Sequence, residues 1–160
     1  FVYRHTFWFG IGLAIAFTFD GLDGAVARMR GMSSRYGGYL DAVVDRYQEL
    51  IVYITLALVT GWWLLCLLAI TGSLMTSYNK ARTAVEIPID NNAWPDLLER
   101  LERVAILCAA LVFDPLIHLP QSWGASVLSL AILLIGVLSH VTAIQRFIRA
   151  RGLILRQTRN

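Results

Sequence analysis

No charged residue occurs between Leu50 and Asn79. A run of this length is too long for one membrane-spanning helix and fits two short ones that meet at Gly61 and Trp62. Hydrophobic residues make up 57% of the 160-residue chain, a composition typical of a membrane protein with one domain. The sequence therefore predicts an all-α fold, a polytopic bundle of transmembrane helices.

Breaks rich in Gly, Ser and Pro divide the chain into five apolar segments. We expect helices over residues 6–30, 38–60, 62–82, 96–113 and 125–149. Lys and Arg gather at the first connection, the third connection and the C-terminal end, and the other two connections have none. Because cytoplasmic loops are enriched in Lys and Arg, we expect these basic ends to face the cytoplasm.

Four aspartates interrupt this apolar setting. Asp20 and Asp23 are one helical turn apart on the first segment, and Asp41 and Asp45 are one turn apart on the second. A carboxylate at membrane depth costs at least about 2.5–3.5 kcal/mol on insertion scales. A hard divalent cation with oxygen ligands offsets this cost, so we predict a site for one or two Mg²⁺ or Mn²⁺ ions. Glu49 follows Asp45 by one more helical turn, and we expect it to form an ion pair or line a cavity.

The polar residues of each segment lie in its cytoplasmic half. They include Asp20, Asp23 and Arg28, then Asp41, Asp45 and Glu49, then Lys80 and Arg82, then Glu99 to Arg103, and finally His140, Gln145 and Arg146. Lipid does not tolerate charge at these depths, so these faces are expected to point inward. The sequence thus predicts a polar cavity that opens to the cytoplasm. Cys66 and Cys108, within the apolar segments, are expected to be buried free thiols.

The aspartates belong to a longer pattern, DGLDGAVARMRGMSSRYGGYLDAVVD over residues 20–45. Its residue types and gaps resemble the signature of the CDP-alcohol phosphatidyltransferase family. The resemblance implies an enzyme of phospholipid biosynthesis that transfers a substituted phosphate from a CDP-linked lipid donor to an alcohol and releases CMP. It implies metal binding by Asp20, Asp23, Asp41 and Asp45, with Asp45 also the catalytic base. It further implies donor binding by Gly24, Ala27, Arg28 and Gly37.

Three basic residues on separate segments bear on the acceptor. Lys80, Arg103 and Arg146 are similar to the basic triad of the branch that makes phosphatidylinositol phosphate and archaetidylinositol phosphate. The resemblance implies inositol phosphate as a soluble acceptor, held through its phosphate. Glycerol 3-phosphate or serine as the acceptor, or CDP-inositol as the donor, remain alternatives. In another interpretation these residues only fix topology or pair with Glu99 and Glu102.

The family is built from six transmembrane helices, whereas five are expected here. We therefore expect residues 1–160 to be the membrane domain without its first helix. The resemblance implies two partners, membrane lipids and a second copy of the chain in a homodimer. It also implies a location in the cell membrane, with the active site facing the cytoplasm. Nucleic acid is not an expected partner, because the chain has a net charge of only +3 and no basic patch interleaved with aromatic residues. A cation transporter is a distant alternative from another functional class.

Overall fold

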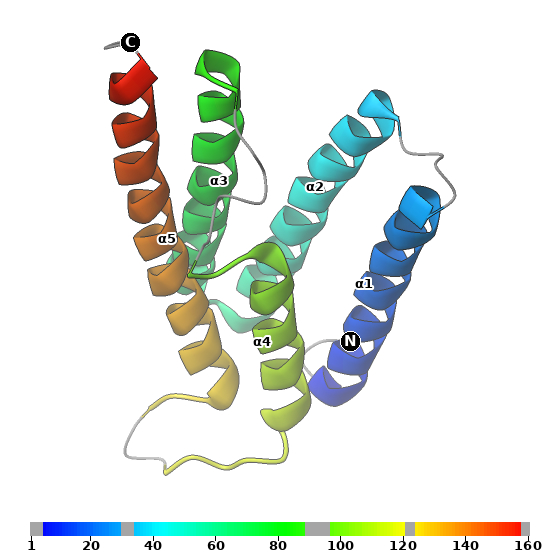
Figure 1. Cartoon of the computed structure of the whole chain (residues 1–160). Coiled ribbons are helices and arrows are strands. Elements are labelled where there is room, and N and C mark those ends of the chain that lie inside the picture. Colours follow the sequence, from blue (N-terminus) through cyan, green and yellow to red (C-terminus); the bar gives the residue numbers. More distant parts are fainter. Residues whose placement is uncertain (1–4, 30–33, 89–96, 121–123, 158–160) are drawn as a thin grey trace.

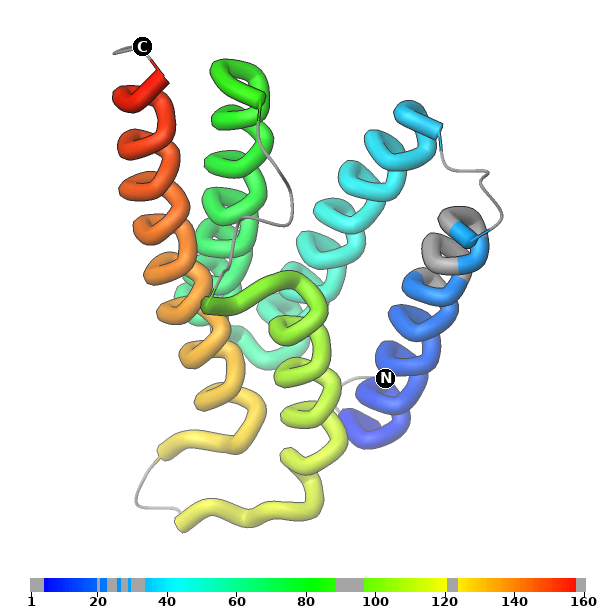
Figure 2. The backbone as a smooth tube through the Cα atoms, in the orientation of Figure 1, coloured from blue at the N-terminus to red at the C-terminus, as the bar shows by residue number. Residues whose placement is uncertain are grey.

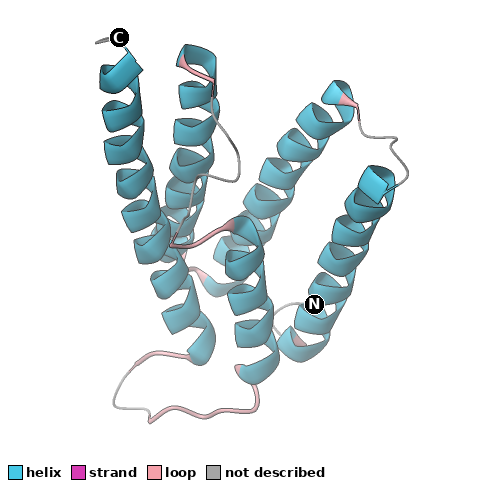
Figure 3. Cartoon of the chain, viewed as in Figure 1, coloured by secondary structure: helices cyan, strands magenta, loops and turns pink. Residues whose placement is uncertain are grey.

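The computed structural model describes residues 5–29, 34–88, 97–120 and 124–157. At positions 20, 23–25, 27 and 28 only the backbone is described. Within these ranges the chain forms five helices and no strand (Figures 1 and 3). They are α1 (Thr6–Met29), α2 (Arg35–Thr60), α3 (Trp63–Glu86), α4 (Arg100–Phe113) and α5 (Val127–Gln157). The prediction of an all-α chain with five helices is confirmed for these residues.

Local signals set both ends of α2. The Ser34 hydroxyl accepts a hydrogen bond from the Gly37 N–H at 2.9 Å, so the helix begins at Arg35 and not at the expected Gly38. At the other end, Gly61 adopts a left-handed conformation with φ 77° and donates its N–H to Ala57. This glycine lets α2 turn directly into α3.

Three other boundaries differ from the expected ones by four residues or more. The helix α3 continues past Arg82 and ends at Glu86. The next residue, Ile87, is extended because Pro88 follows it. The helix α4 begins at Arg100, after Glu99 and Glu102 cap each other's backbone N–H groups. Asp96, where we expected this helix to begin, lies outside the described residues. The helix α5 runs to Gln157, since residues 150–157 contain no proline to stop it.

The pair α3 and α5 forms the most extensive contact between helices. Two glycines bring the backbones close: a Cβ added at Gly72 would lie 2.8 Å from the Cβ of Ser139, and one at Gly136 would lie 2.9 Å from Leu68. Polar bonds continue the seam, with the Thr76 hydroxyl donating to the Ser139 carbonyl at 3.0 Å. Small residues that permit such approach are typical of helix packing in membranes.

The hydrophobic core lies where the helices converge. It includes Tyr53 and Leu56 of α2, Leu111 of α4, and Ile132 and Ile135 of α5. This end of the bundle is at the bottom of Figure 1, below the Asp-bearing ends of α1 and α2. Besides the α3–α5 pair, α1 packs along α4, α2 against α3, and α4 against α5. Cys66 and Cys108 are free and buried, as expected.

Large apolar side chains cover the outside of the bundle. Ile51, Leu58 and Leu64 are among the exposed residues, and Leu64 is 81% exposed. The accessible surface is 10695 Å², whereas a compact soluble protein of this size exposes about 8,000 Å². By length and composition, α5 is the one helix in the described part that could cross a membrane, while residues 6–19 form a shorter apolar stretch. An apolar exterior of this kind is suited to lipid.

Gly72 offers a direct test of the α3–α5 seam. Gly72→Ala should lower the free energy of unfolding by about 1–3 kcal/mol, because the new methyl group collides with Ser139. Thermal unfolding of the detergent-purified protein would measure the change. Gly12→Ala is the matched control, because a Cβ there meets nothing within 4 Å. Equal melting temperatures for the two variants would contradict the close approach.

Candidate active site

Asp45 lies where three helices meet. Its Oδ1 atom is 2.7 Å from Nη2 of Arg100, which belongs to the first turn of α4. The same nitrogen donates to Oε1 of Gln48 at 2.8 Å, and the guanidinium carbon lies 5.3 Å from the centre of the Phe17 ring on α1. Because α4 begins at Arg100, the guanidinium of this residue lies beside the Asp45 carboxylate.

One turn further along α2, Glu49 forms a buried network. Its Oε1 atom accepts from Nε and Nη2 of Arg103 at 3.1 and 2.9 Å. Its Oε2 atom accepts from the Ser73 hydroxyl at 2.6 Å and lies 3.1 Å from Nη1 of Arg46. Arg46 also donates to Ser77 on α3. The expectation that Glu49 forms ion pairs is confirmed, and its carboxylate joins α2, α3 and α4.

Arg103 faces this network. Its side chain is 2% exposed, and besides Glu49 it donates from Nη1 to the Leu98 carbonyl at 3.3 Å. The interpretation that it pairs with Glu99 or Glu102 is wrong for the described contacts, because those glutamates cap α4 and Arg103 binds Glu49. The structure therefore accounts for Arg103 by a contact within the protein.

A cavity of about 560 Å³ lies between α2 and α3. Its polar lining consists of Asp45, Arg46, Ser77, Tyr78, Lys80 and Arg146. Arg146 is buried and donates to the Thr76 carbonyl, while Lys80 is partly exposed. The structure thus brings two of the three predicted phosphate ligands together with Asp45, and Arg103 does not line this cavity.

The remaining predicted site residues lie around the connection between α1 and α2. Asp41 is exposed, one turn before Asp45 on α2, and Gly37 is exposed in the first turn of that helix. Asp20, Asp23, Gly24, Ala27 and Arg28 fall in α1, but their side chains lie outside the described part (Figure 2). Among described side chains, no group of three His, Cys, Asp or Glu is placed to hold a metal ion. Asp41 and Asp45 have the donor chemistry of a hard cation site, and the four-carboxylate site stays a prediction.

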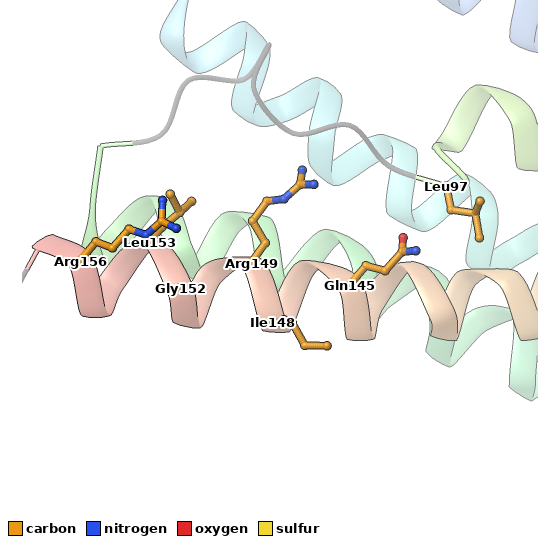
Figure 4. Close-up of a pocket in the computed structure, with 7 residues that line it drawn as sticks. All are labelled: Leu97, Gln145, Ile148, Arg149, Gly152, Leu153 and Arg156. Carbon is orange, nitrogen blue, oxygen red and sulfur yellow. The ribbon is translucent and has the colours of Figure 1, made fainter.

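A second cavity, of about 670 Å³, lies along α5 (Figure 4). It is lined by Leu97, Gln145, Ile148, Arg149, Gly152, Leu153 and Arg156. Figure 4 shows Gln145 and Arg149 extending from the same side of α5, the side on which Leu97 lies. None of the predicted site residues lines this cavity, so it is distinct from the cavity beside Asp45.

Two arginines that contact the site, Arg46 and Arg100, had no separate role predicted from the sequence. A signal was present: Asp45 and Glu49 are four residues apart, and Arg100 and Arg103 are three apart, so each pair spans about one helical turn. Two helices that run in the same direction can match such charges pair by pair. The register between the helices was the missing information.

The family profile described as CDP-alcohol phosphatidyltransferase matches residues 1–142. The archaetidylinositol phosphate synthase of Pyrococcus horikoshii is 32% identical over 144 residues, covering 89% of this chain and 69% of that protein. The corresponding protein of Methanothermobacter thermautotrophicus is 37% identical over 141 residues, covering 85% of this chain and 66% of that protein.

Solved structures agree with the sequence relatives. The Mycobacterium tuberculosis phosphatidylinositol phosphate synthase with CDP-DAG bound is similar with a TM-score of 0.70 and 27% identity, covering 91% of this chain and 73% of that one. The same enzyme in complex with manganese and citrate has a TM-score of 0.74 and 28% identity, covering 91% and 70%. The chain therefore spans about two thirds to three quarters of these relatives.

The Glu49–Arg103 pair predicts a stability effect. Arg103→Ala should lower the free energy of unfolding by about 3–5 kcal/mol, because it removes one partner of a buried ion pair. The double variant Glu49→Leu, Arg103→Met should recover part of this loss, since no charge of the pair then stays buried. Thermal unfolding in detergent would measure both. An Arg103→Ala protein as stable as the parent would show that the pair is dispensable.

Proposed function

Because the chain belongs to the CDP-alcohol phosphatidyltransferase family, we propose that it transfers a substituted phosphate from a CDP-linked lipid donor to an alcohol and releases CMP. The observation that carries this proposal is the cavity that Asp45, the last aspartate of the signature, lines together with Lys80 and Arg146. An acid–base group next to two cations suits the transfer of a phosphate group to a hydroxyl. The family match favours an enzyme over the cation transporter that was the alternative.

We propose that Asp20, Asp23, Asp41 and Asp45 hold one or two Mg²⁺ or Mn²⁺ ions. The manganese complex of the related mycobacterial enzyme supports this proposal, as does the placement of Asp41 and Asp45 one turn apart on α2. When bound, a divalent cation would neutralise the donor diphosphate and polarise the phosphorus under attack. Arg28 would offer a planar fork to phosphate oxygens, and Gly24, Ala27 and Gly37 would leave room for the cytidine.

Asp45 is the proposed base. The acceptor hydroxyl oxygen forms a new bond to the phosphorus that carries the lipid alcohol, and its proton moves to the Asp45 carboxylate. The bond from that phosphorus to the bridging oxygen breaks, and CMP leaves with the electron pair. Asp45 is suited to this role because it lines the cavity between α2 and α3, where Lys80 and Arg146 can hold the acceptor.

The proposed acceptor is inositol phosphate. Two archaeal relatives are archaetidylinositol phosphate synthases, and Lys80 and Arg146 can bind a phosphate monoester through charged hydrogen bonds. Arg103 faces Glu49 in this structure, so we propose that it acts on the acceptor indirectly, by positioning Glu49 and Arg46. Glycerol 3-phosphate, serine and a CDP-inositol donor remain the alternatives within the same chemistry.

We propose that the bundle is polytopic, with the polar ends of its helices facing the cytoplasm. Support comes from the arrangement of the termini: the C-terminal ends of α1, α3 and α5 and the N-terminal end of α2 lie at the same end of the bundle (Figure 1). The apolar exterior supports contact with membrane lipids. Residues 1–160 would then be one membrane domain, and a homodimer is the proposed assembly.

A metal requirement tests the carboxylate site. Asp20→Asn, Asp23→Asn and Asp41→Asn should each nearly abolish CMP release, because each removes a charged ligand. Chelator should do the same, and added Mg²⁺ or Mn²⁺ should restore release in the parent. Glu86→Gln is the control, since Glu86 is an exposed carboxylate that pairs with Arg82 on α3. Full activity in excess chelator would overturn the metal-dependent reaction.

The acceptor proposal predicts a separate kinetic effect. Lys80→Ala and Arg146→Ala should raise the acceptor KM about 10- to 100-fold, the effect of losing one charged partner of a phosphate. Donor binding should stay close to that of the parent. Arg151→Ala is the control, because Arg151 is an exposed arginine of α5 that lines neither the Asp45 cavity nor the cavity of Figure 4. Mass spectrometry of products from a panel of acceptors identifies the substrate, and a preference for glycerol 3-phosphate or serine would exclude inositol phosphate.

A further inference from the structure

Two ion pairs join α2 to α4, and they differ in burial. In the Glu49–Arg103 pair the side chains are 8% and 2% exposed, and Arg103 makes two bonds to one carboxylate oxygen. In the Asp45–Arg100 pair, one turn closer to the helix starts, the side chains are 13% and 25% exposed. A buried pair is locked because separating it leaves charge without water, whereas a pair that reaches solvent can exchange partners.

Arg100 of α4 contacts two other helices, α1 and α2. Its guanidinium contacts the carboxylate that the proposed mechanism uses as base and metal ligand. It also lies over Phe17, three residues before Asp20 on the helix that carries the first signature aspartates. Arg100 therefore lies on the α1 side of Asp45, while Lys80 and Arg146 share the cavity on the α3 side.

A divalent cation and a guanidinium compete for the same carboxylate. Arg100 compensates the charge of Asp45, because its Nη2 atom lies 2.7 Å from Oδ1 of that carboxylate. A cation bound to Asp45 would repel Arg100, because the two positive charges would lie within a few ångströms. The planar fork of arginine matches phosphate oxygens, and a phosphate bound beside the metal would accept it.

We propose that Arg100 is an exchangeable counter-ion of Asp45: it occupies the carboxylate until a divalent cation replaces it, and then binds a phosphate group of a substrate. This inference rests on the proposed function. The phosphate can belong to the donor diphosphate or to the acceptor monophosphate. Arg100 contacts Phe17 of α1, the helix that carries most of the predicted donor-binding residues, and this contact favours the donor. The exchange would give the Asp45 carboxylate a positively charged partner both before and after the divalent cation binds.

Mn²⁺ affinity, measured by electron paramagnetic resonance on the detergent-purified protein, tests the first step. Arg100→Gln should lower the Mn²⁺ dissociation constant about fivefold, the equilibrium factor for the upper value of a part-exposed ion pair. Arg100→Lys, which keeps the charge, should bind Mn²⁺ like the parent. Arg151→Gln, elsewhere on the basic surface, should also leave the affinity unchanged.

A double-mutant cycle assigns the effect to Asp45. In an Asp45→Asn background, Arg100→Gln should no longer change the Mn²⁺ affinity, because the shared carboxylate is gone. An Mn²⁺ affinity that is equal in the parent and Arg100→Gln would overturn the proposal and leave Arg100 as an anchor of α4. Failure of the parent itself to bind Mn²⁺ would instead contradict the proposed function.

Two binding arms identify the phosphate. With Mn²⁺ present, Arg100→Gln and Arg100→Lys should weaken binding of CDP-diacylglycerol about tenfold or more, while the KM for inositol phosphate stays within twofold of the parent. The opposite result, a raised KM with unchanged donor binding, would assign Arg100 to the acceptor phosphate. If neither quantity changes, Arg100 does not bind a substrate phosphate and the second step of the proposal fails.

Discussion

The arrangement of the candidate site depends on one buried carboxylate, that of Glu49. It receives hydrogen bonds from Arg103 of α4 and Ser73 of α3, and an ion pair from Arg46 on its own helix. A buried charge is tolerable only when its oxygens are satisfied, and both oxygens of Glu49 are. This network fixes the start of α4 against α2 and α3, so every contact that Arg100 makes with Asp45 follows from it.

The helices are held together differently at the apolar core and at the polar ends. Small residues in α3 and α5 allow their backbones to approach closely, and hydrogen bonds cross the seam. The helices converge at the apolar core and separate toward the polar ends (Figure 1). Polar groups therefore occupy the part of the structure where packing alone does not hold the helices, and ion pairs between α2 and α4 take over that role.

The helices and their order could be read from the sequence because apolar periodicity and breaks at Gly and Pro are local signals. The end of α3 depends on Pro88 and the start of α2 on Ser34, and these boundaries lie four and three residues from the expected positions. The start of α4 was not predictable in the same way, because any of several polar residues could cap it. The partner of Arg103 was also out of reach, since it depends on the register of α4 against α2 rather than on neighbours in sequence.

The tight connection at Gly61 has a mechanical consequence. From this turn, α2 extends as a stiff rod, and Asp45 lies about 24 Å away at 1.5 Å per residue. A tilt of about 5° at the turn would displace a group at that radius by about 2 Å. The bonds from Arg46 and Glu49 to Ser77 and Ser73 on α3 brace the rod just short of Asp45. Asp41 lies one helical turn beyond these bonds, near the start of α2. Its position therefore depends on the stiffness of the first turns of this helix.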